Sequence, residues 1–196
     1  MCDWERRLLP VRTLGELIVL AKSKPGEFNY GTGGRATDVL MHQVKHVTGI
    51  NVVSVPYKTP GADVTDTIAG QVQITLNFWP ILEPLVKSGK LRALAIAAPT
   101  RHPASPDIPT FAEAGVPGIE MYAWTGLFVP TGTPPDIIDR LQKGISQIIQ
   151  MPAVRDEIIK SGSTVGGTST AEFAAFWRAD RARTGKALAD AGIAPE

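Results

Sequence analysis

Hydrophobic residues in the first half of the chain alternate between helical spacing and short uninterrupted runs. Thr13 and Glu16 match a capping box, in which paired side chains bind the first free N–H groups of a helix. The spacing predicts helices over 13–24, 37–47, 61–69 and 80–87, and the apolar runs predict a strand ending at Tyr30 and strands over 51–55, 72–78 and 91–98. Strands that alternate with helices are typical of a parallel α/β sheet.

The pattern changes after Pro99. Residues 99–109 contain four prolines, which predicts a surface excursion without a covered element. A second capping box, Thr110 with Glu113, predicts a short helix that ends at Gly115. The run 119–130 is long and extended, so we expect a strand that crosses between two lobes.

Three further helices are predicted in the last third of the chain. Thr133 is expected to cap the first of them, with Pro134 at its first position and Asp136 in its first turn. Its apolar stripe consists of Ile137, Ile138, Leu141, Ile145, Ile148 and Ile149. The second is expected from Pro152 to Gly162, and the third from a Ser169–Glu172 capping box to about Ala191.

Composition excludes several classes of function. Lys and Arg total 20 against 19 for Asp and Glu, so the net charge of +1 gives no reason to expect a nucleic-acid partner. The single cysteine, Cys2, allows neither an internal disulfide nor a thiolate metal site. Residues 1–10 lack the apolar core of a signal peptide, and the chain has no apolar run of about 18 residues that could cross a membrane.

The strongest chemical signal is the glycine-rich turn between Tyr30 and the helix expected over 37–47. A turn of this kind exposes the free N–H groups and the positive dipole end of a helix to a carboxylate or phosphate. The alternative is that the glycines only form a tight turn. The turn is not a dinucleotide fingerprint, because no acidic residue follows the next strand, and it lacks the Lys-Ser/Thr pair of a P-loop. Its candidate ligand-binding residues are Thr32, Gly33, Gly34, Arg35, Ala36 and Thr37.

Two other strands end in large polar or aromatic residues. Tyr57 follows the strand expected over 51–55, and Asn77 and Trp79 follow the strand expected over 72–78. Ligands of open α/β sheets bind at the carboxyl ends of the strands, so these residues are candidates for the same crevice as the turn. A structural cap with a half-buried tryptophan explains Asn77 and Trp79 equally well.

No catalytic or metal-binding constellation emerges. His42 and His46 are separated by one helical turn, but no third ligand accompanies them, and solvent exposure with a weak Asp38–His42 pairing is the better interpretation. His102 lies in the proline-rich excursion with no plausible serine or cysteine nucleophile motif near it, and the sequence has no Gly-x-Ser-x-Gly elbow. We therefore expect neither catalytic residues, metal nor cofactor; an enzyme acting on a small phosphorylated or carboxylated metabolite is the alternative hypothesis.

Several motifs together resemble the Bug-type substrate-binding proteins of tripartite tricarboxylate transporters. The resemblance runs from about Leu9 to Glu196. It is carried by Pro25-Gly26 to Tyr30 with its glycine-rich turn, Val55-Pro56-Tyr57-Lys58, Gly70-Gln71-Val72, Lys87 to Ala95, Pro109 to Gly115, and Gly132-Thr133-Pro134-Pro135.

The resemblance implies a type II periplasmic-binding-protein-like fold that closes on a small organic carboxylate and delivers it to membrane transporter subunits in the periplasm. Residues 11–122 would form the complete second lobe and residues 123–196 the C-terminal portion of the first. The family's second lobe binds ligand through the turn at 32–37 and the strand end at 77–79. Arg35 replaces a residue that is usually Asn or Gly, and Ala36 replaces a hydroxyl residue.

The resemblance also carries an expectation about association. Family members are longer and begin with an export signal and the first half of lobe one, with its own carboxylate-binding loop. Without neighbouring strands, we expect apolar surface at residues 119–150 to be covered by another chain, giving a homo-oligomer with weak carboxylate affinity.

Overall fold

Three short parallel strands form the sheet of the structure. The computed structural model describes residues 9–59, 61–103, 105–121, 124–160 and 163–190. The strands are β1 (Asn29–Thr32), β2 (Val53–Ser54) and β3 (Ile74–Leu76), in the order β2-β1-β3. Tyr30 of β1 lies opposite Ser54 on one side and Ile74 on the other. The predicted parallel α/β sheet is confirmed, and β1 is its central strand.

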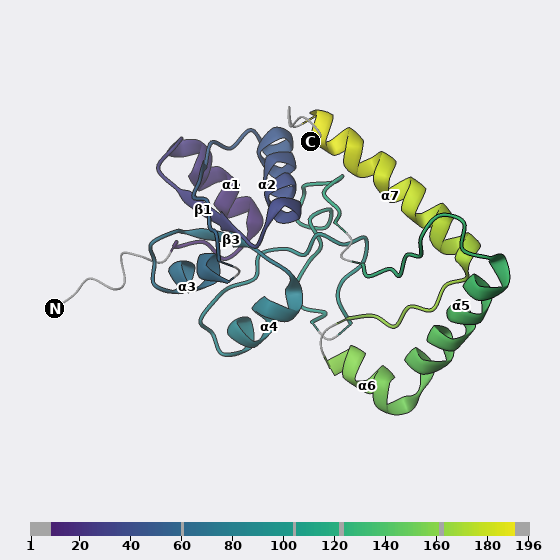
Figure 1. Cartoon of the computed structure of the whole chain (residues 1–196). Helices are drawn as coiled ribbons and strands as arrows, with labels where there is room; N and C mark the ends of the chain where they lie inside the picture. Colours follow the sequence, from purple (N-terminus) through teal and green to yellow (C-terminus); the bar gives the residue numbers. More distant parts are fainter. Residues whose placement is uncertain (1–8, 60, 104, 122–123, 161–162, 191–196) are drawn as a thin grey trace. The chain divides into compact units, whose positions relative to one another are not determined.

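Four helices accompany these strands. They are α1 (Leu14–Ser23), α2 (Arg35–Thr48), α3 (Ala62–Ile68) and α4 (Trp79–Lys87). In the view of Figure 1, α1 and α2 lie above the strands, and α3 and α4 lie below them. Each helix follows a strand or precedes one, so every strand end leads directly into a turn and a helix N-terminus.

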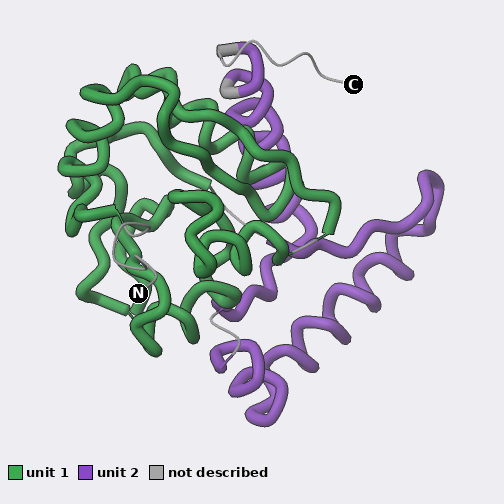
Figure 2. Tube along the Cα trace, turned by 90° about the vertical axis from the view of Figure 1, so that its left-hand side faces the viewer, with its two compact units in different colours: residues 1–123, 190–193 green, residues 124–189, 194–196 purple. Residues whose placement is uncertain are grey.

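The chain divides into two compact units. Unit 1 consists of Met1–Ala123 with Asp190–Ile193, and unit 2 consists of Trp124–Ala189 with Ala194–Glu196 (Figure 2). The core of unit 1 gathers apolar side chains from α1, α2, the strands and the segment after the proline-rich excursion. Its buried members include Leu14, Leu17, Ala21, Tyr30, Leu40, Met41, Val44, Val52, Phe111, Val116 and Ile119.

The N-terminal cap predicted for α1 and the C-terminal glycine predicted for α2 are confirmed. The partner of the Glu16 carboxylate differs from the prediction, since it is the Arg12 N–H and not that of Thr13. The Thr13 hydroxyl accepts the Glu16 N–H at 3.2 Å, while the Glu16 carboxylate accepts the N–H of Arg12 at 2.6 Å. Gly49 ends α2 in the left-handed conformation, with φ of 71°. The α2 face differs from the prediction: Val47 is 52% exposed, and Met41 and Thr48 are buried in addition to Leu40 and Val44.

Three predicted strands are wrong in extent, and one of them, predicted over 72–78, contracts to β3 (Ile74–Leu76). Residues 91–98 do not form a regular strand, because their single ladder contact is an isolated bridge between Ile96 and Thr110. The strand predicted as buried over 51–55 shrinks to two exposed residues. It lies at the edge of the sheet, and there Val53 is 44% exposed although Val52 beside it is buried.

The segment 110–115 forms turns in place of the predicted helix. Its capping-box bonds are present: the Glu113 carboxylate accepts the Thr110 N–H at 2.8 Å, and the Thr110 hydroxyl accepts the Glu113 N–H at 3.2 Å. The Thr110 amide, and after it the Arg101 guanidinium, hold the pKa of Glu113 below its usual value. Gly115 then ends the turns with φ of 89°.

Unit 2 contains the helices α5 (Pro135–Gln150), α6 (Pro152–Lys160) and α7 (Thr170–Asp190). The Ser169–Glu172 capping box before α7 is confirmed. The predicted start of α5 is wrong by one residue, because Pro134 is its cap and the Thr133 hydroxyl binds the Pro130 carbonyl. The predicted ends at Gly162 and Ala191 lie outside the described residues.

The run 119–130 does not form the predicted strand where the structure describes it, that is, outside residues 122–123. Ile119 is buried in the core of unit 1. Trp124 belongs to unit 2, where its ring contacts those of Phe128, Phe173 and Phe176, and its indole N–H donates to Asp180 at 3.0 Å. The run is therefore divided between the two units.

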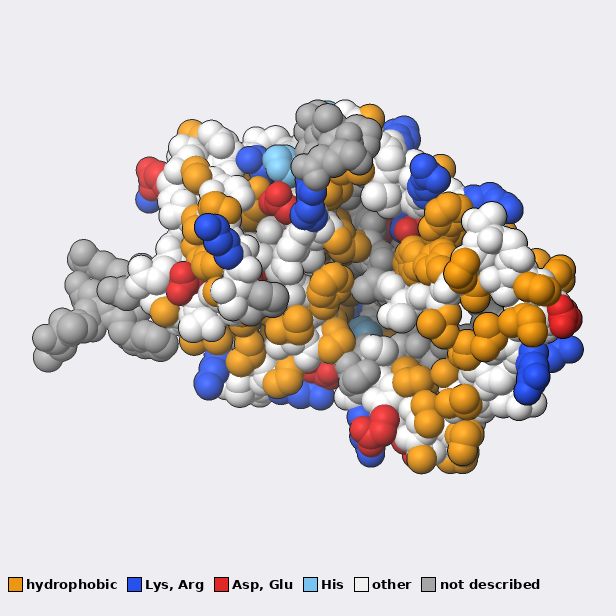
Figure 3. All heavy atoms as spheres, viewed as in Figure 1, with side chains coloured by type: hydrophobic (Ala, Val, Ile, Leu, Met, Phe, Trp, Pro, Cys, Tyr) orange, Lys and Arg blue, Asp and Glu red, His pale blue; other side chains and the backbone are white. Residues whose placement is uncertain are grey.

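Unit 2 exposes much of its apolar surface. Neither α5 nor α6 has a buried residue. Orange hydrophobic side chains gather in Figure 3 where Figure 1 draws these helices. The exposed set includes Leu127, Phe128, Val129, Ile137, Leu141, Ile148, Met151 and Ile159. None of the described helices has the length and apolarity needed to span a bilayer.

Burial within α1 generates a stability prediction. Leu17 is 5% exposed in the core of unit 1, while Val19 in the same helix is 69% exposed. We expect Leu17→Ala to lower the free energy of unfolding by about 2–5 kcal/mol, because it leaves a cavity. Val19→Ala is the matched control and should change it by less than about 0.5 kcal/mol. Urea denaturation followed by circular dichroism measures both, and equal effects would contradict the core assignment.

Candidate functional site

The glycine-rich turn connects the end of β1 to the start of α2. Gly34 is the N-cap of α2, with φ of 145° and ψ of −177°, and no side chain caps the helix. This φ lies in the region that side chains rarely adopt, so a glycine is needed there. The N-terminus of α2 is consequently available to an external acceptor, which is the arrangement that binds carboxylates and phosphates in many proteins.

The two threonines of the turn have different positions. Thr37 is buried, and its hydroxyl donates to the Gly34 carbonyl at 2.9 Å, so it closes the first turn of α2. Thr32 is half-buried at the end of β1. Arg35 and Ala36 are exposed at the start of α2. The exposed guanidinium of Arg35 is thus the permanent cation at this helix N-terminus.

Two glycines of the turn are required by close packing. A Cβ on Gly31 would lie 2.7 Å from the Asp63 Cβ and 2.8 Å from Cε2 of the Tyr57 ring. A Cβ on Gly33 would lie 2.6 Å from the Asn77 Cγ. Such distances are far below van der Waals contact, so the backbone of the turn approaches these three side chains as only glycine permits.

Asn77 forms its bonds within the protein. Its Nδ2 donates to the Asp63 carboxylate at 3.1 Å, and its Oδ1 accepts the Phe78 N–H at 2.9 Å. The Asp63 carboxylate also accepts the Thr75 hydroxyl at 2.7 Å. Asp63 is fully buried, so this polar cluster lies beneath the surface of unit 1.

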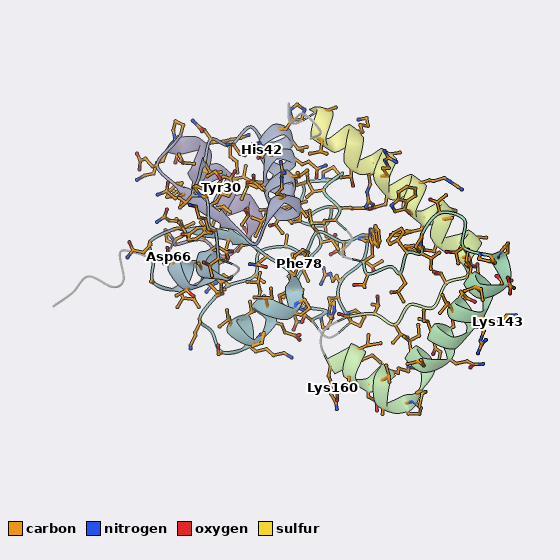
Figure 4. The ribbon with its side chains drawn as sticks, in the orientation of Figure 1. Tyr30, His42, Asp66, Phe78, Lys143 and Lys160 are labelled. Carbon is orange, nitrogen blue, oxygen red and sulfur yellow. The ribbon has the colours of Figure 1, made fainter. Side chains whose placement is uncertain are left out.

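The Tyr57 hydroxyl is also engaged. It donates to the Asp66 carboxylate of α3 at 2.9 Å. Burial, and after it the bond to Asp66, raises the pKa of Tyr57 to about 12, so the phenol stays neutral at physiological pH. Figure 4 labels Asp66 on α3 and Phe78 at the start of α4, the elements that supply these contacts.

Trp79 begins α4 and contacts the proline-rich excursion. Its ring centroid lies 6.2 Å from that of His102, with the planes tilted by 51°. The buried indole Nε1 of Trp79 has no hydrogen-bond partner among the described residues. This aromatic contact places His102 beside Trp79, after the end of β3. The sequence did not indicate that His102 would lie near this strand end.

The structure therefore brings the turn, Tyr57 and Asn77 together at one edge of the sheet. Tyr57 and Asn77 direct their polar atoms at Asp66 and Asp63. Sequence reasoning missed both aspartates, because Asp63 in particular reads as an ordinary first-turn acid of a surface helix. Its burial depends on contacts with β1 and β3 that local sequence does not encode.

The histidines of α2 do not form a metal site in the part of the chain that is described. His46 is exposed as predicted, whereas His42 is half-buried, and no group of three potential ligands gathers among the described residues. Asp38, one turn before His42, accepts a hydrogen bond from the buried Tyr30 hydroxyl at 3.4 Å. Burial raises the pKa of Tyr30, and the neighbouring Asp38 charge raises it to a smaller extent.

Solved structures of several binding proteins resemble this fold. "R. palustris Rpa4515 with adipate" is 32% identical with a TM-score of 0.85, over 96% of this chain and 64% of the other. The "Structure of periplasmic binding protein BugD" has a TM-score of 0.77 at 23% identity, over 96% of this chain and 64% of the other, which shows the fold alone. These neighbours agree with the predicted type II periplasmic-binding-protein-like fold.

Sequence comparison identifies the family. Protein BugT of Bordetella pertussis (strain Tohama I) is 32% identical over 80% of this chain and 48% of its own length. A UPF0065 protein from the tcbD-tcbE intergenic region of Pseudomonas sp. (strain P51) is 28% identical over 91% of this chain and 54% of its own. The chain thus spans about half the length of these curated relatives. Because the family model described as "Tripartite tricarboxylate transporter family receptor" matches residues 6–193, the chain belongs to that receptor family.

Proposed function

We propose that this chain binds a small organic carboxylate at the glycine-rich turn, as part of an extracytoplasmic solute receptor. The observation that carries the proposal is the uncapped N-terminus of α2, which begins at Gly34 with the exposed Arg35 beside it. Backbone N–H groups, the helix dipole and a guanidinium together favour a carboxylate over a neutral ligand. The structural neighbour with adipate supports the same ligand class.

The candidate contacts divide into two groups. We propose that Thr32, Gly33, Gly34, Arg35, Ala36 and Thr37 surround the carboxylate, chiefly through backbone N–H groups and Arg35. Tyr57 and Asn77 support the turn from below, since their polar atoms bind Asp66 and Asp63. Trp79 offers a flat apolar wall at the next strand end, and its indole ring is held against His102.

The organisation of the whole receptor is also a proposal. Residues 11–122 are the candidate second lobe and 123–196 the candidate C-terminal portion of the first. Membership of a transporter receptor family supports a partnership with membrane transporter subunits and a periplasmic location. It also favours a receptor over the alternative of an enzyme for a phosphorylated or carboxylated metabolite. A turnover assay that yields a defined product would support the enzyme instead.

We further propose that the 196-residue chain by itself associates with a second copy through the exposed apolar side chains at residues 124–150. Leu127, Phe128 and Leu141 are among them, and open apolar patches of more than a few hundred Å² are rarely left in water. With a net charge of +1, two copies repel each other little. Ile119 is excluded from this surface because it is buried in unit 1.

The proposed role of Arg35 leads to a prediction about ligand affinity. Arg35→Ala should weaken binding of adipate by about 1.5–3 kcal/mol, because it removes a charge-assisted hydrogen bond to the carboxylate. Isothermal titration calorimetry measures the change. Arg12→Ala is the matched control: it removes the same charge from an exposed position before α1. Unchanged affinity of Arg35→Ala would place that guanidinium outside the binding site.

The proposed association leads to a prediction about the mass of the chain in solution. Multi-angle light scattering of the 196-residue chain should show a dimer or larger species at micromolar concentration. Replacing Leu127 and Leu141 by glutamate should shift the mass toward the monomer, because it places charge on the apolar surface. Val19→Glu, on the exposed side of α1, is the control and should leave the mass unchanged. A stable monomer for the unsubstituted chain would overturn the proposal.

A further inference from the structure

A buried carboxylate lies directly beneath the anion-binding turn. Asp63 of α3 is fully buried, and its Cβ lies 2.7 Å from the position of a Cβ on Gly31. A buried negative charge near a proposed anion site needs an explanation, because it opposes the binding of a second negative charge. We propose that Asp63 is a positioning residue, which orients the Asn77 amide and thereby holds the Gly33 backbone in the geometry that receives the carboxylate. This inference rests on the proposed function of the turn.

The contacts of Asp63 determine how Asn77 is oriented. The Asn77 end that faces the Asp63 carboxyl group is the amide nitrogen, which is the donor end of this side chain. Nδ2 accordingly lies 3.1 Å from Oδ2 of Asp63 and 3.4 Å from Oδ1. At the other end of the amide, Oδ1 accepts the Phe78 N–H at 2.9 Å. The bonds to Asp63 and to the Phe78 N–H both require the same orientation of the Asn77 amide. Removal of the Asp63 side chain therefore leaves only the Phe78 bond to hold that orientation.

Thr75 fixes the carboxylate itself. Its hydroxyl donates to Oδ2 of Asp63 at 2.7 Å, beside the Asn77 bond to the same oxygen. Thr75 belongs to β3, which pairs with β1 through Gly31 and Thr32. The carboxylate is therefore anchored to the strand next to the turn, and its distance from the turn is set by the sheet register.

The Asn77 amide lies directly against Gly33. The Gly33 N–H donates to the Leu76 carbonyl at 3.0 Å, one residue before Asn77. A Cβ on Gly33 would fall 2.6 Å from both the Asn77 Cγ and its Nδ2. With so little space, a rotation of the amide has to displace Gly33, which immediately precedes the N-cap of α2.

Two opposite expectations follow for affinity. If Asp63 acted only through its charge, Asp63→Ala and Asp63→Asn would both strengthen adipate binding, because they remove a repulsion. If Asp63 positions Asn77, Asp63→Ala should weaken binding about fivefold, the value of one ordinary hydrogen bond. Asp63→Asn retains an acceptor oxygen for Thr75 and Asn77, so it should restore most of the affinity. The sign of the change thus separates the two roles.

The test combines these variants with Asn77→Ala and the double variant Asp63→Ala/Asn77→Ala. Calorimetry with adipate should show that Asp63→Ala has no further effect when Asn77 is already alanine, because both act through one contact. Additive losses would overturn the proposal, as would a folded Asp63→Ala protein with unchanged or increased affinity. Asp136→Asn, which removes the charge of an exposed first-turn acid of α5 in unit 2, is the matched control.

A measurement without ligand separates this inference from the proposed function. In ¹H–¹⁵N spectra of the unliganded protein, Asp63→Ala should shift the Gly33 amide and speed its hydrogen exchange about fivefold, since the bond to Leu76 weakens. Asp63→Asn and Asp136→Asn should leave both the shift and the exchange rate close to their original values. An unperturbed Gly33 amide in Asp63→Ala overturns the inference. Failure of the unsubstituted protein to bind adipate counts against the proposed function alone.

Discussion

The close approach of the β1–α2 turn to its neighbours is the constraint on which the candidate site depends. Gly31 and Gly33 have no side chains, so Tyr57, Asp63 and Asn77 can pack against the bare backbone of the turn. Any larger residue would force the turn away from the other two strand ends. Because the turn is held this closely, the N-terminus of α2 emerges in one defined position at the edge of the sheet.

The polar residues of the candidate site have different roles below the turn and at its surface. Below the turn, carboxylates of α3 receive hydrogen bonds from Tyr57, Thr75 and Asn77, so these buried polar groups satisfy one another. Above it, Arg35 and the start of α2 provide positive potential. A polar residue at a strand end is therefore not by itself a sign of ligand contact, because hydrogen bonds from such residues can also hold the turn in place.

The two units differ in how they bury apolar surface. Unit 1 has a continuous core in which α1, α2 and the sheet share buried side chains. In unit 2, α5 and α6 have no buried residue, and the aromatic rings near Trp124 pack chiefly on one another. Helices with one apolar stripe need a surface to cover it. The exposed stripe of α5 is the same feature that makes its helical pattern easy to read in the sequence.

Local signals in the sequence determined where several helices begin and end, although the cap expected at Thr133 lies one residue later and the Thr110–Glu113 box begins turns. The Thr13 and Ser169 caps, the Gly49 terminator and the glycine-rich turn before α2 all depend on residues close together in the chain, and the structure places each of these caps and the terminator where the pattern indicates.

Strand extent, burial and the partners of polar side chains depend on residues distant in sequence, and only the tertiary structure decided them. The apolar run 91–98 has the pattern of a strand, but in the structure its only ladder contact is the isolated bridge between Ile96 and Thr110. Asp63 reads as a surface acid but is buried, because the packing of α3 brings it beneath β1 and β3. This packing determines the hydrogen-bond partner of a side chain, so the sequence could single out Asn77 as a polar residue at a strand end but could not identify Asp63 as its partner.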